Sequence, residues 1–147
     1  MMTEILIKRL SKDINLPKYE TDGSSGMDLS ANINSHIKIE PGETSIIPTG
    51  ISVSIPKNFE IQIRPRSGLA AKNQISVLNT PGTIDADYRG EIKVILINLG
   101  KKTFLIEKGA RIAQMVLSPI EKAKIREVEN LEKTKRGSGG FGSTGTK

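Results

Sequence analysis

One stretch in the middle of the sequence gathers side chains that could carry out chemistry. Residues 79–92 (NTPGTIDADYRGEI) hold an amide at Asn79, carboxylates at Asp85 and Asp87, and a phenol at Tyr88. A positioned carboxylate can deprotonate a water, and an amide offers both the donor and the acceptor needed to read the edge of a pyrimidine. Residues at i and i+2 point to the same side of an extended segment, so the residues alone do not choose between the two carboxylates.

Structural explanations exist for the same residues. Acidic residues in a turn are usually solvated, Asn79 before Thr80 and Pro81 can simply start a turn, and Tyr88 can fill a sheet edge. The Pro81–Gly82 pair predicts a turn in which proline fixes φ at the first central position and glycine accepts a positive φ at the second.

A second segment, RPRSGLA at residues 64–70, is predicted to end a strand and to begin the one short helix of the body, over 67–72. Ser67 could be the N-cap of this helix. A helix N-terminus with free N–H groups at Gly68 and the guanidinium of Arg66 nearby is also suited to bind a phosphate. The two interpretations do not exclude each other.

The C-terminal residues 131–147 are predicted to form a flexible, glycine-rich tail. The run GSGGFG fits the spacing G-x-G-x-x-G, but no strand precedes it closely and only five residues follow, too few for the helix of a dinucleotide-binding fold. Glycines still let backbone N–H groups approach a phosphate, and Arg136 can grip one with two N–H groups. Phe141 is an aromatic residue for which a plain spacer has no use.

Composition restricts the possible functions. The 147-residue chain has a net charge of +6, but residues 133–147 hold four basic and no acidic residues, which leaves 18 basic against 16 acidic residues in the rest. Most of the excess therefore lies on the tail and does little to indicate nucleic-acid binding. The lack of cysteine excludes thiol chemistry and fits a reducing compartment, and no apolar run reaches membrane-spanning length, so we expect a cytoplasmic protein. His36, the single histidine, is expected to be structural.

Positioning these groups requires a β-rich scaffold. Short, β-branched, alternating runs are joined by glycine and proline turns, which is typical of an all-β sandwich or barrel. A single body is expected over residues 1–130, with strands at 3–10, 27–31, 36–39, 44–47, 51–55, 59–64, 75–78, 91–97, 103–106, 111–117 and 123–128.

Five separated segments resemble, in the right order, the motifs of the homotrimeric dUTPases (deoxyuridine 5′-triphosphate nucleotidohydrolases). The segments are SGMDLSA at 25–31, RPRSGLA at 64–70, NTPGTIDADYRGEI at 79–92, RIAQMVL at 111–117 and RGSGGFGSTG at 136–145. Each alone is a modest signal, whereas five in order across nearly the whole chain are specific.

The resemblance implies a jelly-roll-like, distorted β-barrel subunit that assembles as a homotrimer with shared active sites. It also implies hydrolysis of dUTP to dUMP and pyrophosphate by magnesium-assisted attack of water on the α-phosphorus. Such an activity limits uracil incorporation into DNA and supplies dUMP for thymidylate synthesis. Asp85 is similar to the carboxylate that activates the water, and Asp28 to the residue that supports Mg²⁺ indirectly, through water.

The resemblance assigns substrate contacts as well. Asn79 and the backbone of residues 82–84 are expected to read uracil, and Tyr88 to stack on the deoxyribose and exclude a 2′-hydroxyl. The tail is expected to close over the nucleotide, with its phenylalanine on the uracil ring. The full set of expected substrate contacts is Arg66, Ser67, Gly68, Asn79, Gly82, Thr83, Ile84, Tyr88, Gln114, Arg136, Phe141, Gly142, Ser143 and Thr144.

Three other functions are alternatives. A dCTP deaminase of the same fold would convert the base rather than the triphosphate, but the uracil-reading segment and the tail favour the diphosphatase. A non-enzymatic β-barrel that holds nucleic acid with its basic tail would need aromatic residues spread over a sheet face, and the chain has only two tyrosines and three phenylalanines. A non-catalytic regulator on the same scaffold is the third alternative.

Overall fold

The computed structural model describes residues 2–142, which form eleven strands and one short helix. Within this range no helix is long and apolar enough to cross a membrane. In chain order the elements are β1 (Leu6–Arg9), β2 (Met27–Ser30), β3 (Ile37–Ile39), β4 (Thr44–Pro48), β5 (Ile51–Ser54), β6 (Phe59–Arg64), α1 (Ser67–Asn73), β7 (Ile75–Val77), β8 (Gly82–Ile84), β9 (Lys93–Asn98), β10 (Phe104–Ile106) and β11 (Arg111–Pro119).

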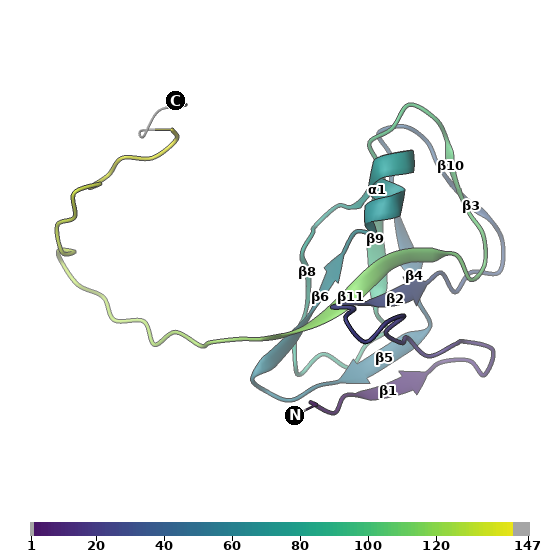
Figure 1. Ribbon diagram of the computed structural model, residues 1–147, viewed down its shortest axis with the longest axis horizontal. Coiled ribbons are helices and arrows are strands. Elements are labelled where there is room, and N and C mark those ends of the chain that lie inside the picture. Colours follow the sequence, from purple (N-terminus) through teal and green to yellow (C-terminus); the bar gives the residue numbers. More distant parts are fainter. Residues whose placement is uncertain (1, 143–147) are drawn as a thin grey trace.

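The strands pair antiparallel in four small sheets that pack around one core (Figure 1). The largest sheet has the order β2-β11-β6-β8, and a three-stranded sheet has the order β4-β9-β7. Two further pairs are β1-β5 and β10-β3. Most neighbours in space are distant in sequence, as in jelly-roll-like barrels. The prediction of an all-β fold with one short helix is therefore confirmed.

The core is aliphatic, as the scarcity of aromatic residues predicts. Alternate residues of a strand face the same side, and the inward-facing Ile61 and Ile63 of β6 and Val94 and Leu96 of β9 are all buried. Within residues 2–142 no aromatic side chain is buried. The barrel is thus held by many interdigitating methyl groups rather than by a few large rings.

One buried amide fixes a corner of the barrel. Asn98, at the end of β9, is fully buried, and its Nδ2 donates to Ile39 O and to Lys102 O, both at 2.8 Å. Its Oδ1 accepts the N–H of Gly100 at 2.9 Å. Because a buried polar group is costly unless it is paired, this saturated amide ties β9 both to β3 and to the following turn.

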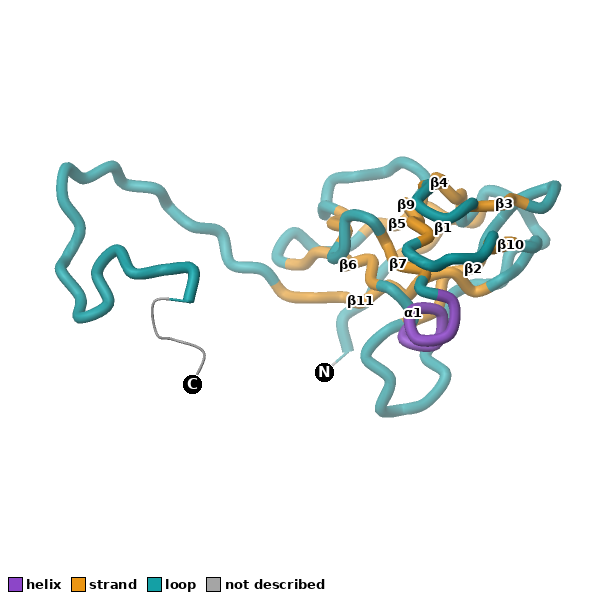
Figure 2. The backbone as a smooth tube through the Cα atoms, turned by 90° about the horizontal axis from the view of Figure 1, so that it is seen from above, coloured by secondary structure: helices purple, strands orange, loops and turns teal. Residues whose placement is uncertain are grey.

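Regular structure ends with β11 at Pro119. Figures 1 and 2 both show the segment after it as an extended chain that leaves the body. The prediction of a strand at 123–128 is wrong, because these residues form no strand and Ile125 is 91% exposed. The apolar pattern favoured a strand there, but a strand requires a neighbour for its N–H and C=O groups, and the described part of this chain supplies none.

Candidate active site

Asp28 on β2 lies at the centre of an ionic cluster. Its Oδ1 accepts a hydrogen bond from Arg66 Nε at 3.0 Å, and its Oδ2 accepts one from Arg111 Nη1 at 3.1 Å. Arg66 Nη1 also donates to Arg111 O at 3.4 Å. Because a single carboxylate balances two guanidinium groups, the cluster keeps a net positive charge. Arginine geometry suits phosphate oxygens, so the cluster can hold a phosphate.

The sheet register aligns Gln114 with this cluster. Asp28 pairs with Gln114, and Gln114 pairs with Arg64, in one row across β2, β11 and β6. Gln114 Nε2 donates to Pro65 O at 2.9 Å. A Cβ atom at Gly26 would lie 2.4 Å from Gln114 Oε1, so a larger residue at position 26 would displace this amide. The structure therefore brings together predicted site residues from three separate motifs.

The helix α1 begins directly beside the cluster. Its N-cap is Arg66, with extended backbone and no side-chain cap, so the prediction of Ser67 as the N-cap is wrong. Ser67 is instead the first helical residue, and both it and Gly68 are exposed. The first N–H groups of a helix have no partner within the helix. Ser67 and Gly68 consequently present free donors next to a guanidinium.

Asn79 and Gly82 meet at the start of β8, where the predicted turn is not found. Gly82 has no positive φ and pairs with Ile63 of β6, because its backbone is extended rather than left-handed. The chain reverses earlier, where the Thr80 N–H donates to Val77 O at 3.1 Å, and the peptide bond before Pro81 is cis. The prediction of a Pro81–Gly82 turn is therefore wrong, because the turn precedes both residues and Gly82 already belongs to β8.

Gly82 is nevertheless constrained to be small. A Cβ atom there would lie 3.2 Å from Asn79 Nδ2 and 3.3 Å from Ile63 Cβ. The Asn79 amide thus lies against the backbone of β8, beside the N–H and C=O groups of an edge strand. An amide next to unpaired backbone groups is a suitable reader for the edge of a base.

Asp85 and Tyr88 border a hollow of about 300 Å³ next to β8. The Tyr88 N–H donates to Asp85 O at 3.1 Å. Residues 85–88 therefore form a turn rather than an extended segment, and the expectation that Asp85 and Asp87 point the same way does not apply. Both carboxylates are exposed. Only Asp85 lines the hollow, whose full lining is Thr83, Ile84, Asp85, Tyr88, Glu91 and Lys93.

The Asp28 cluster and the Asp85 hollow lie at different edges of one sheet. β2 and β8 are separated by β11 and β6, and three strand spacings amount to about 14 Å. Ile84, directly before Asp85, pairs with Ile61, three residues along β6 from the Arg64 row, which adds about 10 Å along the strands. Within one chain the two groups of predicted site residues therefore do not meet.

The tail lies apart from both groups (Figure 2). The predicted tail residues that the structure describes are Arg136, Phe141 and Gly142, whereas Ser143 and Thr144 lie outside the described residues. Arg136 Nε donates within the tail, to Gly139 O at 2.8 Å, and the Phe141 side chain is fully exposed. Neither Arg136 nor Phe141 contacts the hollow of its own chain.

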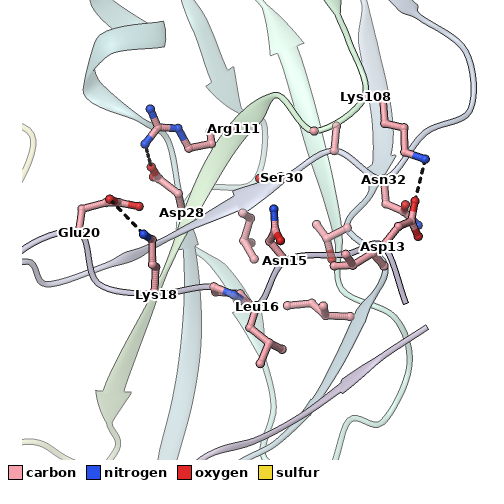
Figure 3. A pocket seen from close by; sticks show the side chains of 17 residues that line it. Asp13, Asn15, Leu16, Lys18, Glu20, Asp28, Ser30, Asn32, Lys108 and Arg111 are labelled. Atoms are coloured by element: carbon pink, nitrogen blue, oxygen red, sulfur yellow. Dashed lines mark hydrogen bonds and ion pairs between the residues drawn. The ribbon is translucent and has the colours of Figure 1, made fainter. Parts of the chain in front are cut away.

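A larger hollow of about 330 Å³ lies under the loop of residues 13–20 (Figure 3). Arg111 and Asp28 form one side of it, and an ion pair of Lys108 with Asp13, at 2.9 Å, forms the other. A hydrogen bond from the Ser11 hydroxyl, followed by the Lys108 ammonium, lowers the pKa of Asp13 to about 2. The acidic and basic side chains that line this hollow form ion pairs with one another.

Sequence reasoning missed Arg111 as the second partner of Asp28. In a regular strand Arg111 and Gln114, three residues apart, would face opposite sides. A β-bulge between Arg111 and Ala113 shifts the register by one residue, so that Arg111 pairs with Ser30 and shares a face with Gln114. Spacing alone gives no sign of a bulge, which is why the pairing was not predicted.

Comparison with known proteins matches this arrangement of motifs. A family model described as dUTPase matches residues 12–145. The chain belongs to the dUTPase family. The deoxyuridine 5′-triphosphate nucleotidohydrolase of Rickettsia bellii (strain OSU 85-389) is 62% identical over 145 residues, which cover 98% of this chain and 97% of that relative.

Solved dUTPase structures share the fold. A mutant dUTPase of Staphylococcus bacteriophage 80alpha with dUpNHpp is 27% identical, with a TM-score of 0.88, and the match covers 99% of this chain and 100% of that one. A mutant dUTPase from phage phi11 of S. aureus, which coordinates a structural Mg(II) ion, is 24% identical with a TM-score of 0.79, and the match covers 88% and 99% of the two chains. The jelly-roll-like barrel described above is thus the dUTPase fold.

Proposed function

We propose that this dUTPase family member hydrolyses dUTP to dUMP and pyrophosphate. The observation that carries the proposal is the presence, on one sheet, of an arginine-rich cluster around Asp28 that can bind phosphate and of a hollow lined by Tyr88 and the exposed carboxylate of Asp85, with the Asn79 amide near the start of β8. The family match also supports the proposed reaction, because it covers most of the chain and the relatives are named for this reaction.

Asp85 is the residue that activates the attacking water. It is exposed and lines the hollow, so it is free to accept a proton from a water aimed at the α-phosphorus. Asn79 and the edge backbone of β8 read uracil, and the lack of a side chain at Gly82 lets the Asn79 amide lie close to that backbone. This base subsite is proposed to leave no space for the methyl group of thymine. Tyr88 stacks on the deoxyribose.

The donor set around Asp28 fits a hydrated Mg²⁺ held by the substrate phosphates. Residues 2–142 contain no group of three or more His, Cys, Asp or Glu side chains that could hold a metal alone. Each Asp28 oxygen already accepts one bond from an arginine, and a carboxylate oxygen has capacity for another. Asp28 can therefore contact water bound to Mg²⁺, an ion that commonly keeps several waters. The ion, when bound, neutralises phosphate charge.

A homotrimer with shared active sites is part of the proposal. The support is geometric, because the two groups of site residues lie about 14 Å apart across the sheet, and a second copy can bring one group next to the other. The tail, which reaches away from its own body, then closes over a site of another subunit. Arg136, Ser143 and Thr144 grip phosphates there, and Phe141 covers the uracil ring.

The proposed reaction fits a cytoplasmic enzyme, because deoxynucleoside triphosphates are made and used inside cells. It removes dUTP before it can be incorporated into DNA and supplies dUMP for thymidylate synthesis. No nucleic-acid or membrane partner is required for either role.

The test is release of pyrophosphate from dUTP, dTTP, dCTP and UTP, each with Mg²⁺ and with a chelator. We expect strong release from dUTP alone and a large loss with the chelator. Ammonia from dCTP without pyrophosphate would instead identify a deaminase, and no reaction with any of the four nucleotides would refute the proposed enzyme.

A further inference from the structure

Three contacts hold Tyr88 in place: one at its hydroxyl, one at its backbone N–H and one where its ring meets residue 90. Its hydroxyl donates to Glu91 O at 2.9 Å, and its N–H donates to Asp85 O at 3.1 Å. A Cβ atom built on Gly90 would lie 2.4 Å from the Tyr88 hydroxyl oxygen and 2.6 Å from Cζ. The phenol therefore lies directly on the backbone of residue 90, in a position that no larger residue there would allow.

The residue that receives the Tyr88 hydroxyl is itself anchored. Glu91 Oε1 accepts the N–H of Gly50 at 2.9 Å, although the two residues are 41 positions apart in the sequence. Gly50 lies between β4 and β5, so its N–H takes no part in strand pairing and is available to Glu91. A carboxylate that accepts a backbone N–H makes a charge-assisted hydrogen bond, which is stronger than a neutral one.

The corner that holds Glu91 has little freedom. Gly50 has a φ of +71°, and a Cβ atom there would lie 2.1 Å from Ile14 Cδ1. On either side of it, the Thr49 hydroxyl donates to Ile92 O at 2.6 Å and the Ile92 N–H donates to the carbonyl of residue 51 at 2.9 Å. The Thr49 N–H also donates to Ile92 O, at 3.2 Å. The chain at residues 91–92 is thus attached to a buried, close-packed corner by four hydrogen bonds, one of which the Glu91 side chain accepts.

We infer that Glu91 is a positioning residue that sets the specificity of the sugar subsite. It fixes the carbonyl that holds the Tyr88 hydroxyl, and Gly90 lets the ring lie close against the chain. The inference rests on the proposed function, in which Tyr88 contacts the deoxyribose. A ring that excludes a single 2′-hydroxyl must be fixed to within about an ångström, since displacements of that size have large effects in active sites. The rigid corner at residues 49–51 supplies that precision.

The test compares kcat/KM for dUTP and for UTP in Glu91→Ala, Glu91→Gln and the unaltered enzyme. Glutamine keeps a side-chain oxygen that can accept the Gly50 N–H, so we expect its dUTP-to-UTP ratio to stay within about threefold of the unaltered enzyme. Alanine removes the acceptor, and the ratio is expected to fall roughly tenfold or more, mainly through better use of UTP. Glu43→Ala is the matched control, because that side chain is exposed and makes no hydrogen bond within residues 2–142.

Gly90→Ala reaches the same ring without altering Glu91, and it is expected to lower the ratio as well. If Glu91→Ala does not fold, Gly90→Ala still tests whether the position of the Tyr88 ring sets the dUTP-to-UTP ratio. An unchanged ratio in the variants that fold would overturn the inference. So would equal loss of both activities at an unchanged ratio, which indicates a purely structural role, and so would a Gln variant as poor as the Ala variant. An unaltered enzyme that releases no pyrophosphate from dUTP would instead refute the proposed function itself, and the inference with it.

Discussion

Removal of the Asp28 carboxylate should destabilise the protein measurably. In Asp28→Ala, Arg66 and Arg111 both lose their partner. A hydrogen bond to a charged group contributes about 1.5–3 kcal/mol, and the Arg66 side chain, 28% exposed, is buried enough for that range to apply. The Arg111 side chain is 52% exposed, so solvent screening limits its pair to about 0–1 kcal/mol. The expected loss in the free energy of unfolding is about 1.5–4 kcal/mol.

Asp28→Asn is a milder substitution at the same position. Its amide keeps the shape of the side chain and one acceptor oxygen, so one of the two arginine bonds can persist. We expect a loss of about 1–2 kcal/mol, between that of the alanine variant and zero. Asp22→Ala removes an exposed carboxylate that makes no hydrogen bond within the described residues, and it should change stability by no more than about 0.5 kcal/mol.

The measurement is urea unfolding followed by far-ultraviolet circular dichroism at one fixed protein concentration. The concentration is held constant because assembly makes the midpoint depend on it. An Asp28→Ala midpoint equal to that of Asp22→Ala would refute the reasoning, since the carboxylate would then contribute nothing beyond its own solvation. Equal losses for the Ala and Asn variants would contradict the assignment of one bond to each arginine.

Three further predictions concern catalysis, the tail and the barrel corner. Asp85→Asn should keep nucleotide binding and lower kcat by about 10² to 10⁴-fold in steady-state assays, whereas near-normal turnover would assign the base to Asp87. Deletion of residues 136–147 should leave the assembly intact in size-exclusion chromatography and cripple turnover, and a fall to monomers would make the tail structural instead. Asn98→Ala removes the partner of one buried and two part-buried backbone groups and should lower the free energy of unfolding by about 1–3 kcal/mol in denaturant titration, while full stability would show that water replaces the amide.

Sequence patterns predicted the strands well where alternation and burial agree. The run at 59–64 became β6 with Ile61 and Ile63 inward, because burying one face of a strand enforces a period of two. The run at 123–128 has comparable apolar content but lacks a neighbour in the described chain. An apolar run thus becomes a strand only where a neighbouring strand can pair with it, and the local sequence does not specify that neighbour.

Site residues could be predicted from the sequence where their role follows from residue type within a motif. They could not be predicted where their role depends on how distant parts of the backbone are placed. Asp28, Arg66 and Gln114 were named from motifs. The register of β2 and β11 places Gln114 opposite Asp28, and Arg66 reaches Asp28 from the residue before α1. The bulge that turns Arg111 toward Asp28, and the corner that binds Glu91, depend on long-range backbone positions. Such positions leave no mark on the spacing of nearby residues.

The aliphatic core has an optical consequence. The protein contains no tryptophan and only two tyrosines, and both Tyr19 and Tyr88 are partly exposed to solvent. Its ultraviolet emission therefore comes from two phenols, one of which borders the hollow beside Asp85. In Tyr19→Phe the remaining signal would report Tyr88 alone, so that binding of a nucleotide could be followed through an intrinsic fluorophore, without any attached label.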